Sequence, residues 1–236
     1  MTTDAPAAPR PLVIFDLDGV LVDTQDAENG ALAHVGELMG LTLGREERDA
    51  LFSGKKMQEC LDLMEELTGT APPANATALA RARCEELIGD RMDPVDGAVP
   101  ALRALTATGL TLCVASNSPR EIIERRLDKA GILHPFGGRL FSAYDVSAWK
   151  PDPGLFLWAA AECGTDPAAC LVVEDSAVGV DAALGAGMPV LQYTPDPGTG
   201  PHRPGARLLP SLHDLPDLVR HHFASAPHPV RPGGRS

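Results

Sequence analysis

The sequence predicts an α/β protein in which a parallel sheet is covered by helices and is interrupted by an all-helical insert. Three observations support this prediction. Short apolar runs end in polar residues at three places along the chain, helical patterns separate those runs, and the long stretch after the first run carries helical patterns only. A length of 236 residues suits one such core with a smaller inserted domain.

The apolar runs are expected to form the strands. They cover residues 12–15, 110–115 and 170–173, and a fourth strand is expected at residues 189–193. Runs without alternating polar residues are typical of strands that are buried on both faces, as in parallel sheets. The first three runs end in Asp16, in Ser116 and Asn117, and in Glu174 and Asp175. Because ligands bind beyond the carboxyl ends of parallel strands, we expect these polar residues to share one site.

Helical spacing of apolar residues fills the segments between the strands. The expected helices are residues 24–39, 56–67, 76–88, 98–106, 119–130, 153–163, 176–186 and 214–223. Ser118 followed by Pro119 resembles a helix N-cap with proline at the first helical position. The resulting domain prediction is a core of residues 1–22 and 92–223 and a helical cap of residues 23–91. Residues 224–236, rich in Pro, Gly and Arg, are expected to form a disordered tail.

The composition is that of an ordinary globular protein, with 44% hydrophobic and 22% charged residues. No apolar run is long enough to cross a membrane, and the first residues lack a signal-peptide pattern. Five scattered cysteines favour reduced thiols in a cytoplasmic protein. A net charge of −12 argues against nucleic acid as a partner. We therefore expect a cytoplasmic monomer or weak dimer that binds neither nucleic acid nor membranes.

Candidate chemistry begins directly after the first strand. Asp16 and Asp18 are two residues apart and can face one cavity, and Gly19 permits a sharp turn behind them. One carboxylate can attack phosphorus while the other handles a proton. Ser116 and the backbone amide of Asn117, at another strand end, can hold an anion. Each pattern alone is common in helix caps and metal loops, so the argument depends on their combination.

A cation and a metal complete the predicted site. Lys150 lies in a loop stiffened by proline, and Glu174 with Asp175 suits a hard cation that prefers oxygen ligands. Two like charges about 4 Å apart repel by roughly 4 kcal/mol at an effective dielectric of about 20. An Asp16 carboxylate could not approach a phosphate dianion against that repulsion unaided. The charge balance therefore predicts that Mg²⁺ and Lys150 act together at this site.

These four segments, in this order, resemble the four motifs of the haloacid dehalogenase superfamily. Residues 15–24 match its first motif, Ser116 the second, Lys150 the third, and Glu174 with Asp175 the fourth. The resemblance covers nearly the whole chain. It implies a Rossmann-like parallel sheet core whose active site is closed by a helical cap inserted just after the first motif.

The resemblance also implies a role for each residue. Asp16 would form an aspartyl-phosphate and bind Mg²⁺. Asp18 would protonate the leaving group, then activate water, and would give its backbone carbonyl to the metal. Ser116 and the Asn117 amide would hold the phosphoryl oxygens, and Lys150 would neutralise nucleophile and phosphate. Asp175 would bind the metal directly, and Glu174 directly or through water.

A closer resemblance is to a subgroup described as 6-phosphogluconate phosphatases, which is carried by residues 140–153, by residues 52–56 and by the C-terminal region from 196 to 216. It suggests a small phosphorylated metabolite, such as a sugar-acid phosphate, as substrate. We hypothesise that Lys55 or Lys56, after Gly54, reaches a carboxylate or hydroxyl on that substrate.

Other activities on this fold remain open. In the resembling β-phosphoglucomutases a histidine stands twelve positions after the nucleophile, where this chain has Glu28, which favours a phosphatase over a mutase. Dehalogenases lack the second aspartate, which is present as Asp18. A phosphonate hydrolase would need a Schiff-base lysine from the cap, where Lys55 and Lys56 are the only adjacent pair. A non-catalytic binding protein is the remaining alternative, although every motif residue is intact.

Overall fold

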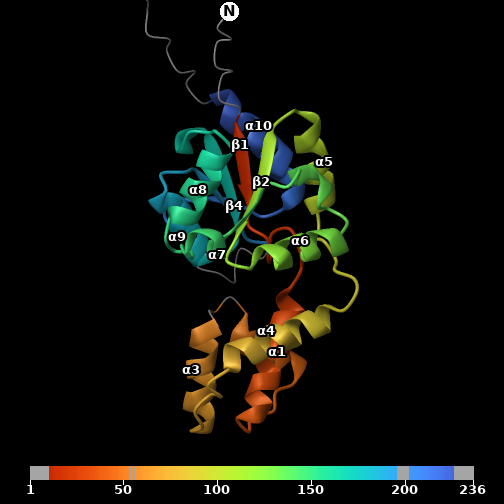
Figure 1. The fold of residues 1–236 in the computed structure, drawn as a ribbon, viewed down its shortest axis with the longest axis vertical. Helices are drawn as coiled ribbons and strands as arrows, with labels where there is room; N and C mark the ends of the chain where they lie inside the picture. The colour runs from red at the N-terminus through yellow and green to blue at the C-terminus, as the bar shows by residue number, and fades with distance from the viewer. Residues whose placement is uncertain (1–10, 54, 56, 196–201, 226–236) are drawn as a thin grey trace, which may run out of the picture.

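The protein is described by a computed structural model that covers residues 11–53, 55, 57–195 and 202–225. Figure 1 shows two bodies, a core built on a sheet and a group of helices beyond one end of it. In the described chain, no helix combines the length and the apolar character that crossing a membrane requires.

The core is a parallel sheet of six strands in the order β3-β2-β1-β4-β5-β6. The strands are β1 (Leu12–Phe15), β2 (Thr111–Ser116), β3 (Leu140–Ser142), β4 (Cys170–Glu174), β5 (Val190–Tyr193) and β6 (Arg207–Leu209). Phe15 at the end of β1 lies opposite Val114 of β2 and Val173 of β4. The register therefore brings the predicted polar strand ends to one edge of the sheet, which confirms the α/β class with a parallel sheet.

Side chains alternate between two apolar layers along the central strand. Val13 and Phe15 belong to one buried cluster, and Leu12 and Ile14 belong to the other. Because both faces are covered, all four consecutive positions of β1 are apolar, as the sequence pattern indicated.

Helices cover both faces (Figure 1). Those packed on the first cluster include α5 (Ala98–Ala107), α6 (Arg120–Lys129) and α10 (Leu215–Ser225), and those packed on the second include α8 (Gly154–Glu162) and α9 (Ala177–Gly185). The remaining short elements are α7 (Ala143–Val146), η1 (His134–Phe136), η2 (Pro167–Ala169) and η3 (Leu212–Asp214).

The expected N-cap of the helix after β2 was wrong. Helix α6 begins at Arg120, and Pro119, which has no side-chain acceptor, stands at the capping position. The Ser118 hydroxyl instead lies 3.4 Å from Asp18 Oδ2, which draws it toward the edge of the sheet.

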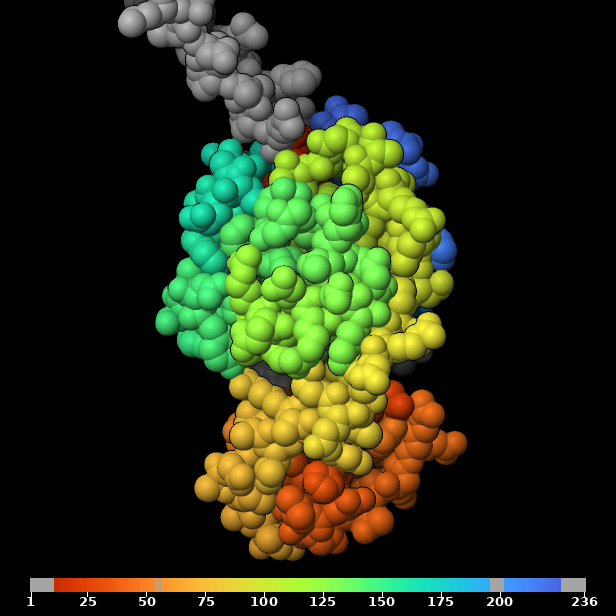
Figure 2. All heavy atoms as spheres, turned by 45° about the vertical axis from the view of Figure 1, so that its right-hand side comes forward, coloured from red at the N-terminus to blue at the C-terminus, as the bar shows by residue number. Residues whose placement is uncertain are grey.

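The inserted helices are α1 (Gln25–Leu38), α2 (Arg45–Phe52), α3 (Met57–Thr68) and α4 (Ala76–Ile88). They bury an apolar cluster of their own, which includes Val35, Phe52 and Met64. Helix α2 was not expected from the sequence. The chain enters and leaves this group at neighbouring points, where the Asp23 amide donates to the Asp93 carbonyl at 3.0 Å. The carboxyl ends of the strands face these helices, and Figure 2 shows the two bodies in direct contact.

Candidate active site

Asp16 lies at the centre of the candidate site, directly after β1. Its backbone amide donates to the Val173 carbonyl at 2.9 Å, so the sheet hydrogen bonding continues through it. The Lys150 ammonium lies 2.5 Å from Asp16 Oδ1 and 2.7 Å from Glu174 Oε1. The Lys150 side chain is only 3% exposed, and its Nζ stands 4.9 Å from the centre of the Phe156 ring. A lysine far along the chain is thus buried between two predicted site carboxylates.

The Asn117 side chain holds the loop that carries this lysine. Its Oδ1 accepts a hydrogen bond from the Lys150 backbone amide at 2.9 Å. The sequence had suggested only the backbone amide of Asn117, as a phosphate ligand. The side-chain contact joins the end of β2 to the Lys150 loop and helps to set the position of the ammonium group.

Glu174 is fully buried, and both of its carboxylate oxygens have partners. Oε1 accepts from Lys150, and Oε2 accepts from the backbone amide and the hydroxyl of Ser176 at 2.7 and 3.0 Å. Gly179 of α9 lies against this carboxylate, and a Cβ there would stand 1.7 Å from Oε1. A glycine is therefore required at this position of α9 because of the Glu174 side chain.

Burial and like charges shape the electrostatics of the carboxylates. Burial is the largest influence on Asp16 and, with Glu174 and Asp18, raises its pKa to about 7, although Lys150 opposes this change. Burial, Glu174 and Asp16 raise the pKa of Asp175 well above its ordinary value. Burial alone would lower the pKa of Lys150, but Asp16 and Glu174 raise it above its ordinary value. The lysine is therefore held in its charged form, but its single positive charge does not offset the burial and mutual repulsion of Asp16 and Asp175.

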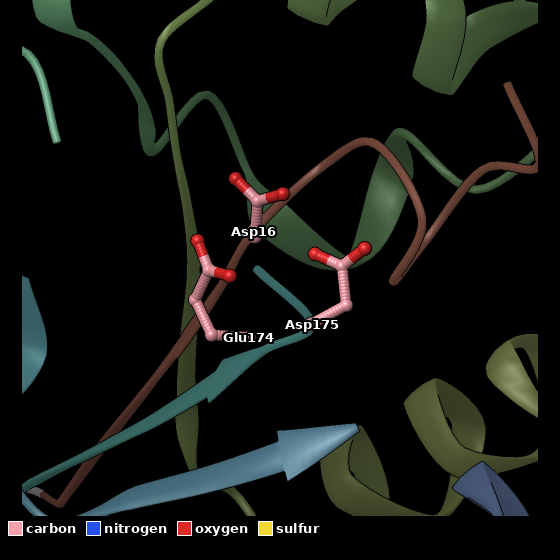
Figure 3. Close-up of side chains that lie close together, drawn as sticks. All are labelled: Asp16, Glu174 and Asp175. Carbon is pink, nitrogen blue, oxygen red and sulfur yellow. The ribbon is translucent and has the colours of Figure 1, made fainter. Parts of the chain in front are cut away.

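These carboxylates fit a divalent cation. Ligand atoms of Asp16, Glu174 and Asp175 all lie within 4.8 Å of one another, and Figure 3 shows the three carboxyl groups gathered at the ends of β1 and β4. An all-oxygen donor set with excess negative charge suits Mg²⁺. Because both oxygens of Glu174 already accept hydrogen bonds, Asp16 and Asp175 are the better placed direct ligands.

The turn after Asp16 depends on Gly19. Its φ of +80° lies in the left-handed region, and a Cβ there would stand 2.2 Å from Asp175 Oδ2. Gly19 therefore allows the turn that carries Asp18 to pass close to the Asp175 carboxylate.

Asp18 has partners that sequence reasoning missed. Arg126 Nη1 donates to Oδ1, and the Ser118 hydroxyl lies 3.4 Å from Oδ2. The Ser118 amide donates to Ser116 Oγ at 3.0 Å, so the end of β2 is linked to the same group. A charged residue on a predicted helix gives no sign of such a contact in the sequence.

The predicted core residues are thus brought together, whereas Lys55 of the cap has no hydrogen bond or ion pair with them in the described chain, its ammonium being bonded within the cap. Lys55 is exposed and follows the end of α2, and its ammonium donates to the Leu51 carbonyl of that helix at 2.6 Å. The predictions for Gly54 and Lys56 fall outside the described residues.

Comparison with known proteins adds independent evidence. A family model described as haloacid dehalogenase-like hydrolase matches residues 11–187. The chain is 34% identical to the 6-phosphogluconate phosphatase of Escherichia coli over 208 residues, which are 87% of this chain and 93% of that protein. It is 28% identical to hexitol phosphatase B of the same organism, over 77% of this chain and 83% of that protein.

A solved structure agrees with these similarities. A haloacid dehalogenase family hydrolase from Deinococcus radiodurans, crystallised with bound phosphate and sodium, has a TM-score of 0.74 and 28% identity. The match covers 92% of this chain and 97% of that one. By its family match, its sequence similarity and its fold, the chain belongs to the haloacid dehalogenase-like hydrolases.

Proposed function

We propose that the protein is a Mg²⁺-dependent phosphatase that hydrolyses small phosphate monoesters through an aspartyl-phosphate on Asp16. One observation carries the proposal: Lys150 is buried between Asp16 and Glu174, at 2.5 and 2.7 Å, beside the Asp175 carboxylate. That arrangement supplies a nucleophile, a fixed positive charge and oxygen ligands for a cation within one small space.

The nucleophile is Asp16. Lys150 lowers the repulsion between its carboxylate and an incoming phosphate dianion, and the hydrogen bond from Lys150 to Oδ1 leaves Oδ2 as the attacking atom. Ser116 and the Asn117 amide, at the end of β2, hold the phosphoryl oxygens. When bound by Asp16, Asp175 and the Asp18 carbonyl, Mg²⁺ supplies positive charge that stabilises the transferring phosphoryl group.

Asp18 moves the protons. In the first step the bond between phosphorus and the ester oxygen breaks, and Asp18 gives its proton to that oxygen, which leaves as an alcohol. In the second step Asp18 accepts a proton from water, which attacks phosphorus and releases Asp16 and inorganic phosphate. Glu174 keeps Lys150 and Ser176 in place and contacts the metal directly or through water.

For the substrate we propose a sugar-acid phosphate such as 6-phosphogluconate. The support is the similarity to a 6-phosphogluconate phosphatase over most of both chains. We propose that Lys55, which follows α2, reaches the substrate carboxylate. Gly54 and Lys56, its neighbours in the sequence, belong to the same proposed substrate-binding segment.

We propose that residues 1–22 and 92–223 act as the catalytic core and residues 23–91 as a cap that covers the substrate. All five cysteines are free, which favours a reducing compartment such as the cytoplasm. The proposed working form is a monomer or weak dimer acting on a small phosphorylated metabolite.

Phosphate release from a panel of esters tests this function. The panel contains 6-phosphogluconate, hexose phosphates, phosphoglycolate and phosphoenolpyruvate, each with Mg²⁺ and with chelator. Preference for 6-phosphogluconate with Mg²⁺ supports both activity and substrate, and broad weak release supports the activity alone. Conversion of one sugar phosphate into an isomer without free phosphate would identify a mutase. No turnover of any ester would favour a binding protein.

A further inference from the structure

Arg126 of α6 contacts both the loop after β1 and the cap. Its Nη1 donates to Asp18 Oδ1, while Nε and Nη2 donate to Glu85 Oε1 at 3.1 and 2.8 Å. Glu85 lies in α4, so one guanidinium group joins a core carboxylate to a cap carboxylate.

This contact is sheltered from solvent. The Arg126 side chain is 8% exposed, and those of Asp18 and Glu85 are 21% and 22% exposed. Arg125, the preceding residue, also pairs with Glu85, through Oε2 at 2.5 Å, but its side chain is 44% exposed. Charge pairs in sheltered positions are less screened than surface pairs, and the planar guanidinium fixes the direction of its hydrogen bonds.

The geometry determines which oxygen of Asp18 is available for proton transfer. Oδ1 accepts from the guanidinium group, which holds the carboxyl group in one orientation. Oδ2 has only the distant Ser118 hydroxyl, at 3.4 Å, as a hydrogen-bond partner in the described chain. The oxygen with the weaker contact is the one free to carry and release a proton.

We propose that Arg126 is a positioning residue that orients the acid/base Asp18, and that Glu85 makes this orientation depend on the cap. The inference rests on the proposed phosphatase function. With the cap in its described position, Glu85 fixes two donor atoms of the guanidinium group, and the third is aimed at Asp18. When the cap moves away, Arg126 loses that anchor and Asp18 loses its fixed orientation. Proton donation is thereby confined to the state in which the cap covers the substrate.

The test uses the dependence of rate on the leaving group. An alkyl ester such as 2-phosphoglycerol needs a proton from Asp18 as its bond to phosphorus breaks, whereas p-nitrophenol leaves without one. The quantity measured is kcat/KM for both esters, because it reports the steps up to the first phosphoryl transfer. General acid catalysis contributes roughly 10²–10⁴-fold, so Arg126→Gln should lower kcat/KM at least about 10-fold for the alkyl ester. For p-nitrophenyl phosphate the loss should stay below about 3-fold, since the acid contributes little there.

Two further variants and one control variant test the roles of Glu85 and of the Arg126 charge. Glu85→Gln should give a smaller loss with the same preference for the alkyl ester. Arg126→Lys should lower the alkyl-ester rate less than Arg126→Gln does, because an ammonium group keeps the positive charge. It should not reach the wild-type rate, because an ammonium group cannot pair with both carboxylates in the same geometry. Arg125→Gln is the matched control, since Arg125 shares Glu85 as partner. In the described part of the chain Arg125 pairs with Glu85 and has no hydrogen bond or ion pair with Asp18, so this variant should leave the ratio of the two rates unchanged.

Equal losses on both esters, or the same change of ratio in Arg125→Gln, would overturn the inference. Thermal unfolding of each variant identifies one that does not fold, and Glu85→Gln then provides the deciding comparison. If the wild-type protein releases phosphate from neither ester, the proposed function fails, and that outcome is distinct from a failure of the role of Arg126.

Discussion

Gly179 and Glu174 approach each other so closely that any side chain at position 179 would displace the Glu174 carboxylate. A Cβ at Gly179 would stand 1.7 Å from Oε1, the atom that accepts from Lys150. We therefore predict that Gly179→Ala disturbs the site through Glu174 and lowers Mg²⁺-dependent phosphate release at least about 10-fold, since small misplacements of catalytic groups are costly.

Gly185→Ala is the matched control for this variant. Gly185 belongs to the same helix, and the nearest atom to a Cβ there is Pro153 Cβ at 3.6 Å, an ordinary contact. Alanine favours a helix over glycine by up to about 1 kcal/mol, so this variant should keep its activity and its stability. Equal activity in the two variants would show that Glu174 does not need its observed position.

A second prediction compares alanine substitutions at two glycines, of which only Gly19 lies against the Asp175 carboxylate of the proposed metal site. Gly19 and Gly40 have similar φ angles of +80° and +85°, but a Cβ at Gly19 would meet Asp175 Oδ2 at 2.2 Å, whereas one at Gly40 would have nothing within 4 Å. Both alanine variants should lose about 1 kcal/mol or more of stability from the left-handed backbone. Only Gly19→Ala should also raise the Mg²⁺ concentration needed for half-maximal activity. If Gly40→Ala raised it equally, the effect would belong to strain and not to Asp175.

Lys150→Met should be strongly destabilised. It leaves Asp16 and Glu174 as buried carboxylates without their shared cation, and removal of one partner of a buried ion pair typically costs about 3–5 kcal/mol. Urea unfolding in chelator measures this loss without a metal to replace the lysine. Adding Asp16→Asn should recover part of it, because one of the repelling charges is removed.

The control lysine is Lys129, which is partly buried and whose ammonium donates to the Gly89 carbonyl in an exposed hydrogen bond. Lys129→Met should change stability by no more than about 0.5 kcal/mol. A Lys150→Met protein as stable as this control would contradict the buried charge balance described for the site.

The pH dependence of stability should show the effect of ionising the Glu28 carboxyl group. Burial, followed by the nearby Asp18 charge, raises the pKa of Glu28 to about 7 from its ordinary 4.5. The carboxyl group of the unfolded chain ionises first, so folding is increasingly opposed as the pH rises from 4.5 to 7. Glu28→Gln should therefore stabilise the protein at pH 8 and have little effect near pH 5.

At pH 8 the expected rise in Tm is roughly 2–4 °C, which corresponds to about 1 kcal/mol in a protein of this size. Differential scanning calorimetry at both pH values, without divalent ions, provides the measurement. The same change of Tm at both pH values would mean that ionisation of Glu28 is not responsible.

The central strands and the carboxylate cluster could be predicted because each depends on a pattern within a short stretch of sequence. β1, β2 and β4 are continuous apolar runs with polar residues at their ends, and a parallel sheet gathers those ends at one edge. β3 and β6 were not predicted. Each has three residues, too few to show a pattern, and two of the three residues in β6 are exposed.

Contacts made across the chain could not be predicted in this way. Arg126 lies 108 positions from Asp18 and 41 from Glu85, and on a helix it has the pattern of an ordinary solvated residue. Ser118 was assigned to a helix cap because its neighbour is proline, a local signal that the contact with Asp18 overrides. Helix α2 is rich in charged residues, and its apolar contribution comes mainly from Phe52, so its helical spacing was weak.

The central claim is that Asp16 carries the phosphoryl group, and chemical trapping tests it directly. Enzyme turning over its best ester with Mg²⁺ is quenched with borohydride, which reduces an acyl phosphate to an alcohol, and the peptide that contains Asp16 is analysed by mass spectrometry. The account predicts conversion of Asp16 to homoserine only when substrate and Mg²⁺ are both present, together with loss of phosphate release in Asp16→Asn. Sustained phosphate release with Asp16 unmodified, and retained by Asp16→Asn, would contradict it.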